Sequence, residues 1–220
     1  MSGSASDELV VVAATEREAA PFRQRGLGVV VSGVGRVNAA VATTLAVTSR
    51  SSPPMVVSAG VAGALPSPAD SQSPPAIGSI VIGDRAVYAE EGMISSEGFT
   101  TISDMGFPVA TFARGNSILP DPDALDRLRR SVPEARVGSI ATVATCSATD
   151  ELADEIALRT GSVAEAMEGA AVIHAARLLG AAAVEIRTIS NRTGERARQG
   201  WDLEAALSAL DAVARALASG

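Results

Sequence analysis

The sequence predicts one α/β domain over residues 1–220, a three-layer α/β/α fold in which a mostly parallel or mixed central sheet lies between two layers of helices. Short apolar runs rich in Val alternate along the chain with segments whose apolar residues recur at helical spacing, and this order is typical of α/β folds. The chain has 220 residues, of which 47% are hydrophobic, so it can bury one sizeable core. We therefore expect a single domain.

The first half of the chain begins with two short apolar runs of buried-strand length, followed by a helical pattern of small and apolar residues. A Ser-Ser-Pro-Pro break and a loop rich in Ser, Pro and Asp separate the next strands. In order, we expect strands at 9–14 and 28–32, a helix at 37–47, a strand at 55–58, an exposed loop at 66–75 and a strand at 78–88. Residues 89–107 have no clear period, and we expect an active-site flap or an irregular excursion there.

In the second half, strands and helices alternate regularly. Pro120 and Pro122 open an exposed helix, and a capping residue, Thr149, starts the next one. We expect helices at 121–130, 149–159, 169–179 and 202–217, strands at 137–144, 163–167 and 183–189, and a polar loop at 191–200.

Charge and composition argue against several kinds of partner. The net charge of −7 and the pI near 4.8 oppose binding to nucleic acid or to an anionic membrane surface, because both depend on clustered Lys and Arg. The chain has one Cys, one His and no Lys, so we expect no metal site, no cofactor and no Schiff-base chemistry. No apolar run reaches the length of a membrane span, and residues 1–8 lack the features of a signal peptide, so we expect a cytoplasmic protein.

Three polar residues, Glu18, Glu168 and Asn191, each come shortly after an apolar run that we expect to be a strand. Ligands of open α/β sheets bind in the crevice outside the carboxyl ends of the strands, so these three side chains are candidates for one site. A crevice that gathers two carboxylates and an amide is typical of an enzyme.

Two other patterns invite a catalytic interpretation and have a simpler alternative. Residues 33–38, Gly-Val-Gly-Arg-Val-Asn, follow a strand and precede a helix as in a dinucleotide-binding motif, but Asn38 stands where the third glycine belongs, which favours a plain tight turn. Cys146 and His174 could form a nucleophile and its base, but one ends a strand and the other lies in an Ala-rich helix, which favours core packing.

Four segments carry a resemblance to a known family. They read Ser-Gly-Val-Gly-Arg-Val-Asn-Ala-Ala at 32–40, Ala-Gly-Val-Ala-Gly at 59–63, Glu-Ala-Met-Glu-Gly-Ala-Ala at 165–171 and Ile-Arg-Thr-Ile-Ser-Asn at 186–191. In order and spacing, over essentially the whole chain, they resemble the purine nucleoside phosphorylase and nucleosidase superfamily. Within it, residues 190–198 with Trp201 are similar to the signature of the futalosine hydrolases, as are Glu97-Gly98-Phe99 and Gly106-Phe107.

The resemblance implies a nucleoside phosphorylase-like fold and a small-molecule nucleoside substrate. It implies hydrolysis of the N-glycosidic bond of futalosine, which releases hypoxanthine and dehypoxanthine futalosine in menaquinone biosynthesis. It also implies a homo-oligomer, a dimer or larger. The alternatives are another purine nucleosidase or phosphorylase of the same superfamily, and a catalytically weak nucleoside-binding module.

Glu168 is expected at the ribose. Cleavage of an N-glycosidic bond passes through an oxocarbenium-like sugar, so a carboxylate beside the ribose interacts more strongly as positive charge develops. In the family the matching Glu accepts hydrogen bonds from ribose hydroxyls, and the matching Met, here Met167, packs against the ribose. A Glu that ends a strand can instead cap the following helix. Further substrate contacts are expected from Thr149 and from the backbone of Ala62 and Gly63.

Glu18 matches the position at which the nucleosidases carry a Glu that activates the attacking water, whereas the phosphorylases carry a Gly-rich phosphate loop. The residues before Gly60 also lack the Arg that phosphorylases use to bind the phosphate dianion. We therefore expect water as the nucleophile and Glu18 as its base. A solvated place in the first turn of a helix is the competing interpretation, with Glu16 as the competing base. Val61 departs from the family, which often has Ser there.

Asn191 is expected to discriminate between bases. Adenine-specific relatives have Asp at this position, which can protonate N7, whereas an amide cannot ionise but can donate to N7 or to a 6-oxygen. Hypoxanthine spreads its departing negative charge onto O6, so Asn191 would stabilise the leaving group by a hydrogen bond. An Asn that simply turns the chain after a strand is the alternative.

Arginine is the side chain best suited to grip the aryl carboxylate on the 5′ extension of futalosine, because it can donate two parallel hydrogen bonds. We nominate Arg196 or Arg198, against the alternative that both are solvated loop charges. Ala197 lies between them where the family has Asp, so the local loop contacts are expected to differ.

Overall fold

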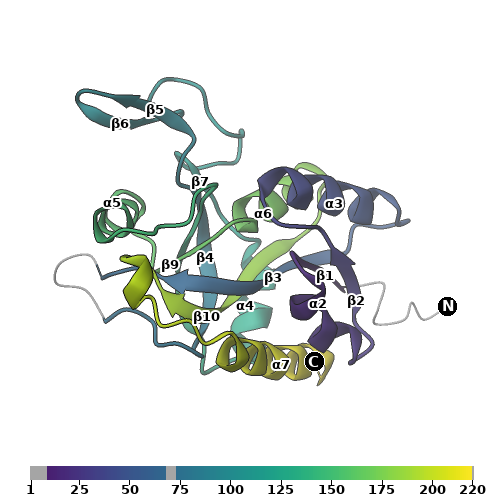
Figure 1. Ribbon diagram of the computed structural model, residues 1–220. Helices are drawn as coiled ribbons and strands as arrows, with labels where there is room; N and C mark the ends of the chain where they lie inside the picture. Colours follow the sequence, from purple (N-terminus) through teal and green to yellow (C-terminus); the bar gives the residue numbers. More distant parts are fainter. Residues whose placement is uncertain (1–8, 68–72, 220) are drawn as a thin grey trace.

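The structure is a computed structural model that describes residues 9–67 and 73–219, and it has a central mixed sheet with helices packed on both faces (Figure 1). The expectations for residues 1–8 and for positions 68–72 of the predicted loop lie outside the described residues. The elements are β1 (Leu9–Ala13), α2 (Glu16–Arg23), β2 (Gly28–Val31), α3 (Arg36–Thr48), β3 (Met55–Ala64), β4 (Ile80–Tyr88), β5 (Gly92–Ser95), β6 (Gly98–Thr101), β7 (Ser117–Ile118), α4 (Pro122–Ser131), β8 (Arg136–Thr142), α5 (Asp150–Thr160), β9 (Ala164–Ala166), α6 (Gly169–Leu178), β10 (Ala183–Arg192), the 3₁₀ helix η1 (Arg196–Arg198) and α7 (Leu203–Ser219).

The described part of the chain forms an eight-stranded sheet in the order β10-β4-β8-β9-β3-β1-β2, with β7 paired to β4. Strand β3 is long enough to change neighbours: its first residues pair with β1, and Gly63 and Ala64 pair with β9. Because β3 also pairs in parallel with β10, the strands β10, β4, β8, β9 and β3 close into a ring. The predicted fold class is confirmed, and the closure brings the ends of several strands to one place.

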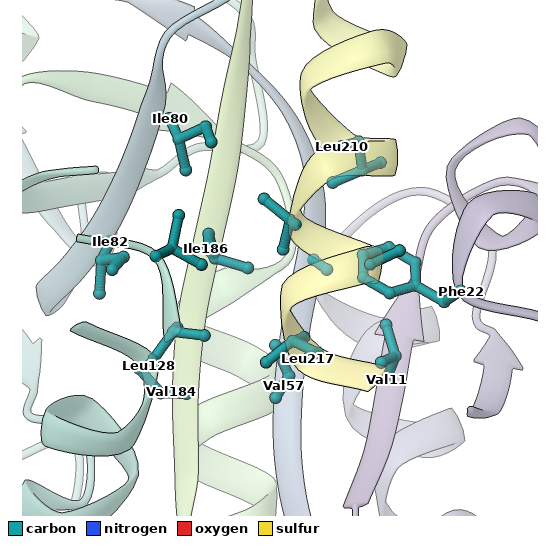
Figure 2. Close-up of a cluster of buried hydrophobic side chains, with 14 of the residues drawn as sticks. Val11, Phe22, Val57, Ile80, Ile82, Leu128, Val184, Ile186, Leu210 and Leu217 are labelled. Atoms are coloured by element: carbon teal, nitrogen blue, oxygen red, sulfur yellow. The ribbon is translucent and has the colours of Figure 1, made fainter. Parts of the chain in front are cut away.

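Two hydrophobic layers hold the sheet between its helices. Alternate residues of β1 divide between them, because successive side chains of a strand point to opposite faces. Val11 packs in the layer under α2, α4 and α7, where Phe22 and Leu210 are fully buried (Figure 2). Val10 packs in the layer under α3 and α6. Burial of these apolar faces is the main stabilising contribution to the fold.

Several elements differ from the sequence-based expectation. The strand predicted at 55–58 extends to Ala64, and the strand predicted at 183–189 extends to Arg192, so the loop predicted at 191–200 begins later. Helix α2 has no counterpart among the predicted elements. The segment 89–107 contains the β5–β6 hairpin, which projects from the body at the upper left of Figure 1. No residue of the segment 89–107 lines the cavity described below.

No helix in the described ranges is both long and apolar enough to cross a membrane.

Candidate active site

A cavity of ≈ 530 Å³ lies where strands β1, β3, β9 and β10 end, together with the loop after β8 and the start of α7. Its lining includes Glu18, Ala62, Gly63, Met167 and, in the same space, Glu168 and Asn191. The structure therefore brings together the three polar residues that the sequence singled out, at the edge of the sheet where α/β proteins bind ligands. The volume suits a small organic molecule.

Glu18 is fixed in the cavity wall by its own helix start. Thr15 caps α2, and the two residues form a reciprocal capping box in which Glu18 Oε2 accepts hydrogen bonds from Thr15 N (3.0 Å) and Oγ1 (2.7 Å). Its other oxygen, Oε1, accepts from Val61 N (2.9 Å) on β3. Glu18 is 6% exposed, whereas the competitor Glu16 is exposed and pairs with Arg23. The solvated alternative for Glu18 is therefore wrong.

Glu168 lies between β9 and α6 and is 5% exposed. It occupies the N-cap position of α6, but its side chain makes no capping hydrogen bond, so the helix-cap alternative is wrong. Instead its Oε1 accepts from Gly35 N (3.0 Å) and its Oε2 from Arg187 Nη1 (3.3 Å). The turn at 33–38 thus directs the backbone N–H of Gly35 to the Glu168 carboxylate.

Arg187 is a buried arginine that the sequence reasoning did not select. It is 1% exposed and donates to Glu185 Oε1 (2.8 Å from Nε), Ser58 Oγ (3.1 Å from Nη2) and Glu168. Burial alone would lower the pKa of Arg187, but the surrounding carboxylates overcome this and raise it, so the guanidinium stays charged. The signal that could have found it is a charged pair, Glu185 and Arg187, inside an otherwise apolar strand.

Gly60 allows the carboxylate of Glu18 and the guanidinium of Arg187 to approach each other over β3. A Cβ at Gly60 would lie 2.5 Å from Glu18 Oε1 and 2.7 Å from Arg187 Nη1. Only glycine fits between these groups. Glu18 and Glu168 therefore face the cavity with the buried Arg187 behind them, and carboxylates so placed stabilise positive charge that develops in a bound ligand.

Asn191 lies within β10, at an irregular step of the strand between Ile189 and Asn191, so the alternative that it turns the chain after the strand is wrong. It is 5% exposed, and its amide is oriented by two hydrogen bonds. Ser190 Oγ donates to Oδ1 (2.9 Å), and Nδ2 donates to Arg192 O (2.8 Å). The amide nitrogen carries two hydrogens, so one remains for a ligand. A Cβ at Gly63 would lie 3.3 Å from Asn191 Nδ2. Because glycine has no Cβ, the approach to the amide stays open.

The structure does not bring Cys146 and His174 together. Cys146 lies in the loop after β8, is exposed and lines the cavity, so the expectation that it packs in the core is wrong. Burial of its thiol nevertheless raises its pKa, which disfavours the thiolate. His174 lies in α6 with Nδ1 3.2 Å from Tyr88 Oη and packs edge-on against Phe112, as core packing predicts.

The remaining predicted residues divide between the cavity and the surface. Arg196 lines the cavity, with its guanidinium 5.5 Å from the Trp201 ring. Thr149 caps α5 through Leu152 N, and Arg198 forms an ion pair with Asp150, and neither residue lines the cavity. A second arginine in the lining, Arg17 of α2, was not selected from the sequence.

Within residues 9–67 and 73–219, no group of three or more His, Cys, Asp or Glu side chains is arranged to hold a metal ion.

Comparison with known proteins identifies relatives that match between 61% and 84% of this chain. A protein from Thermus thermophilus named futalosine hydrolase is 33% identical over 84% of this chain and 78% of its own length. Futalosine hydrolases from Acidothermus cellulolyticus and Streptomyces coelicolor are 39% and 36% identical over 61% and 73% of this chain. The chain spans 55% and 64% of the lengths of these two relatives.

Solved structures share the fold at lower sequence identity. A methylthioadenosine/S-adenosylhomocysteine nucleosidase from Colwellia psychrerythraea in complex with adenine superposes with a TM-score of 0.78 at 20% identity, over 97% of this chain and 95% of its own. A futalosine hydrolase mutant of Helicobacter pylori superposes with a TM-score of 0.73 at 17% identity, over 95% and 96%. The model of the phosphorylase superfamily matches residues 9–219. With this match over nearly its whole length and a cavity at the strand ends, the chain belongs to the phosphorylase superfamily.

Proposed function

We propose that this protein is a cytoplasmic nucleosidase that hydrolyses the N-glycosidic bond of futalosine, releasing hypoxanthine and dehypoxanthine futalosine in menaquinone biosynthesis. The observation that carries the proposal is the convergence of Glu18, Glu168 and Asn191 on one cavity. The relatives named futalosine hydrolase support the choice of substrate. No metal or cofactor takes part in the proposed reaction.

Glu18 acts as the general base in this proposal. Its carboxylate is held by three hydrogen bonds from Thr15 and Val61, so it is pre-oriented toward the cavity. A water that donates to it is activated for attack at C1′ of the ribose. The same fixed carboxylate leaves no cluster of donors for a phosphate dianion at this position, which supports water over phosphate as the nucleophile.

Glu168 acts on the sugar. It accepts hydrogen bonds from ribose hydroxyls, and these interactions strengthen as positive charge develops on the ring. Arg187 and Gly35 hold the carboxylate in place, and Met167 provides the apolar surface beside it. Ala62 and Gly63 supply backbone contacts along the other wall.

Asn191 acts on the leaving base. Its free amide hydrogen donates to N7 or O6 of hypoxanthine, where the departing negative charge gathers. The 5′ extension with its aryl carboxylate binds at an arginine of the lining. Arg196 was predicted for this contact, and Arg17 is a second candidate because it lines the cavity beside the apolar residues Leu203 and Leu207. An apolar surface next to a guanidinium suits an aryl carboxylate.

The chain is further proposed to act as a homo-oligomer. Helix α3 exposes apolar side chains one turn apart: Val37 is 77% exposed, Val41 54% and Leu45 64%. An apolar stripe of this kind on the surface is typical of a protein interface. Light scattering of the protein and of Val41→Arg tests this proposal: a dimer or larger assembly that the variant weakens supports it, and a monomer contradicts it.

The substrate is tested by incubating the protein with futalosine and with inosine and measuring the hypoxanthine released. We expect release from futalosine to be faster, because inosine lacks the arm that carries the aryl carboxylate. No hypoxanthine from either compound would contradict the proposed function. Equal rates of hypoxanthine release from futalosine and inosine would indicate a general purine nucleosidase that does not recognise the 5′ extension.

A further inference from the structure

Glu204 forms an ion pair beside the cavity for which the proposed reaction has no use. Arg17 of α2 donates from Nη2 to Oε1 of Glu204, in the first turn of α7, across 2.9 Å. Arg17 lines the cavity, and so does Leu203, the residue before Glu204. An arginine that faces the ligand space is therefore already bound to a carboxylate of the protein itself.

This ion pair is open to solvent. The side chains of Arg17 and Glu204 are 60% and 86% exposed. Exposed ion pairs contribute little to stability, because water solvates both charges well when the pair is broken and because two long side chains lose freedom when it forms. Glu204 can therefore leave the arginine at small cost, and another carboxylate can take its place.

A second ion pair joins the same part of the fold without facing the cavity. Arg25, which follows α2, donates to Asp211 of α7 across 2.5 Å, and these side chains are only 28% and 33% exposed. Apolar side chains of α2 and α7 also pack in one buried cluster. The contact between the two helices is thus secured elsewhere and does not require the pair at the cavity.

The described lining of the cavity contains two arginines, Arg17 and Arg196, and they belong to different walls. Arg196 follows Asn191 in one loop, which Gln199 ties to the loop after β8 through Ser147 O, so it belongs to the wall proposed for the base. Arg17 belongs to the wall formed by α2 and α7. The base and the 5′ carbon leave a ribose ring from opposite sides of its ring oxygen, so the wall away from the base suits a 5′ arm.

From these observations we propose that Glu204 is a built-in competitor for the carboxylate of the substrate: it occupies Arg17 in the free protein and gives way when an anionic 5′ arm binds there. The proposal rests on the nucleosidase function proposed above and names the group that the arm must displace. A guanidinium can bind one carboxylate through two parallel hydrogen bonds, which favours the exchange. Leu203 and Leu207 in the same wall provide apolar surface for the aryl ring.

The competition has a consequence that a simple binding residue would not have. Arg17 receives the arm only while Glu204 is away, so the apparent affinity for an anionic arm is reduced by the fraction of the protein in which the arginine is free. A weak exposed pair leaves this fraction substantial, and we expect a penalty of about threefold. A neutral arm does not need the guanidinium and escapes the penalty. Removal of Glu204 should therefore improve binding of the anionic arm alone.

The alternative is that Arg17 and Glu204 merely link α2 to α7. Loss of such a link would loosen this wall of the cavity and weaken the binding of anionic and neutral arms alike. Glu16→Gln is the matched control, because it removes the same charge from the exposed face of α2 and breaks only the pair with Arg23. It therefore measures how much a change in net charge alone affects an anionic ligand.

The experiment uses two C-nucleoside analogues of inosine, whose glycosidic carbon–carbon bond resists cleavage. One carries a meta-carboxybenzyl group on its 5′ oxygen, and the other carries the neutral meta-carbamoylbenzyl group. Trp201 is the only tryptophan of the chain and lines the cavity, so its fluorescence reports binding. The two affinities are measured for the protein, Glu204→Gln, Arg17→Ala and Glu16→Gln.

We expect the carboxylate analogue to bind about threefold more tightly to Glu204→Gln and about tenfold more weakly to Arg17→Ala, with the carbamoyl analogue unchanged in both and neither analogue changed in Glu16→Gln. An unchanged affinity for the carboxylate analogue in Glu204→Gln, a loss of both affinities, or an equal gain in Glu16→Gln would overturn the proposal. None of these titrations involves turnover. A protein that binds both analogues as described but does not cleave futalosine would contradict the proposed function alone, and one that cleaves futalosine but shows no effect of Glu204→Gln would contradict this proposal alone.

Discussion

Arg187 Nη1 donates to Glu168 Oε2 across 3.3 Å inside the core, where the two residues are 1% and 5% exposed. The same guanidinium donates to Glu185. It also lies close to Glu18 over Gly60, where a Cβ would be 2.5 Å from Glu18 Oε1 and 2.7 Å from Arg187 Nη1. One buried cation therefore orients the carboxylate proposed to bind the ribose and lies beside the carboxylate proposed to activate water.

Replacing Arg187 should destabilise the protein strongly. In Arg187→Met, Glu185 keeps its place in the core without its cation, and we expect the free energy of unfolding to fall by about 3–5 kcal/mol in urea denaturation. Adding Glu185→Leu removes the uncompensated charge and should recover part of the loss. Arg198→Met breaks only the solvent-exposed pair with Asp150 and should leave the free energy of unfolding almost unchanged. An equally small loss in Arg187→Met would show that the buried network contributes little.

The water-activating function of Glu18 is tested by Glu18→Gln. The amide keeps the size of the side chain but cannot take a proton, so we expect kcat to fall by about a hundredfold or more while KM changes little. Glu16→Gln is the matched control, because Glu16 lies two residues away on the exposed face and pairs with Arg23. Unchanged turnover in Glu18→Gln, or an equal loss in Glu16→Gln, would remove Glu18 from the mechanism.

Binding of the aryl carboxylate of futalosine should depend on an arginine that lines the cavity. We expect Arg17→Ala or Arg196→Ala to reduce the preference for futalosine over inosine by about tenfold or more, because a charge-assisted hydrogen bond is lost. Arg198→Ala serves as the control, since this side chain lies outside the lining and pairs with Asp150. A preference that survives both cavity substitutions would mean that the carboxylate is held elsewhere.

The stability of the fold should fall in mild acid because of His174. Burial lowers the pKa of this side chain from its ordinary value of 6.5, so the unfolded chain takes up the proton more readily than the folded protein. Stability is then fully retained above pH 6.5 and decreases as the pH falls from 6.5 toward the folded pKa, by at most about 1.4 kcal/mol per pH unit. Unfolding midpoints measured from pH 7.5 to 5 should show this slope, and His174→Gln should reduce it. An identical slope in the variant would assign it to other groups.

Much of the fold could be predicted because local signals and tertiary structure agree. The Val-rich runs at 9–14 and 28–32 pack on both faces of the sheet, so a short continuous apolar run correctly indicates a strand inside it. The helical pattern at 202–217 buries one face of α7. The places of Glu18 and Glu168 shortly after β1 and β9 likewise follow from where the apolar runs stop.

The differences arise where tertiary structure overrides local pattern. Strand β3 continues past Ser58 through small residues because β10 and then β9 supply backbone partners along its whole length. Asn191 remains in a strand for the same reason, since its backbone pairs with Gly63. No single-sequence pattern reveals such pairing. Helix α2 was missed because its eight residues include Pro21 and four charged residues, and its Thr15 cap was not recognised.

The partners of the buried charged residues could not be predicted from the sequence. Glu185 and Arg187 look like an interruption of an apolar strand, and only the closure of the sheet puts Ser58 and Glu168 within their reach. Glu165 lies in the segment 165–171, which was singled out because of Glu168. Its place opposite Gly63 depends on β9, a strand of only three residues between β3 and β8, and so short a strand leaves no clear sequence pattern.

The account is tested most directly by identifying the nucleophile. Futalosine is incubated with the protein in H₂¹⁸O, with and without inorganic phosphate, and the sugar product is analysed by mass spectrometry. We expect one ¹⁸O in the sugar product, no sugar 1-phosphate and the same rate in both conditions, since Glu18 activates water. A requirement for phosphate together with formation of a sugar 1-phosphate would contradict the account.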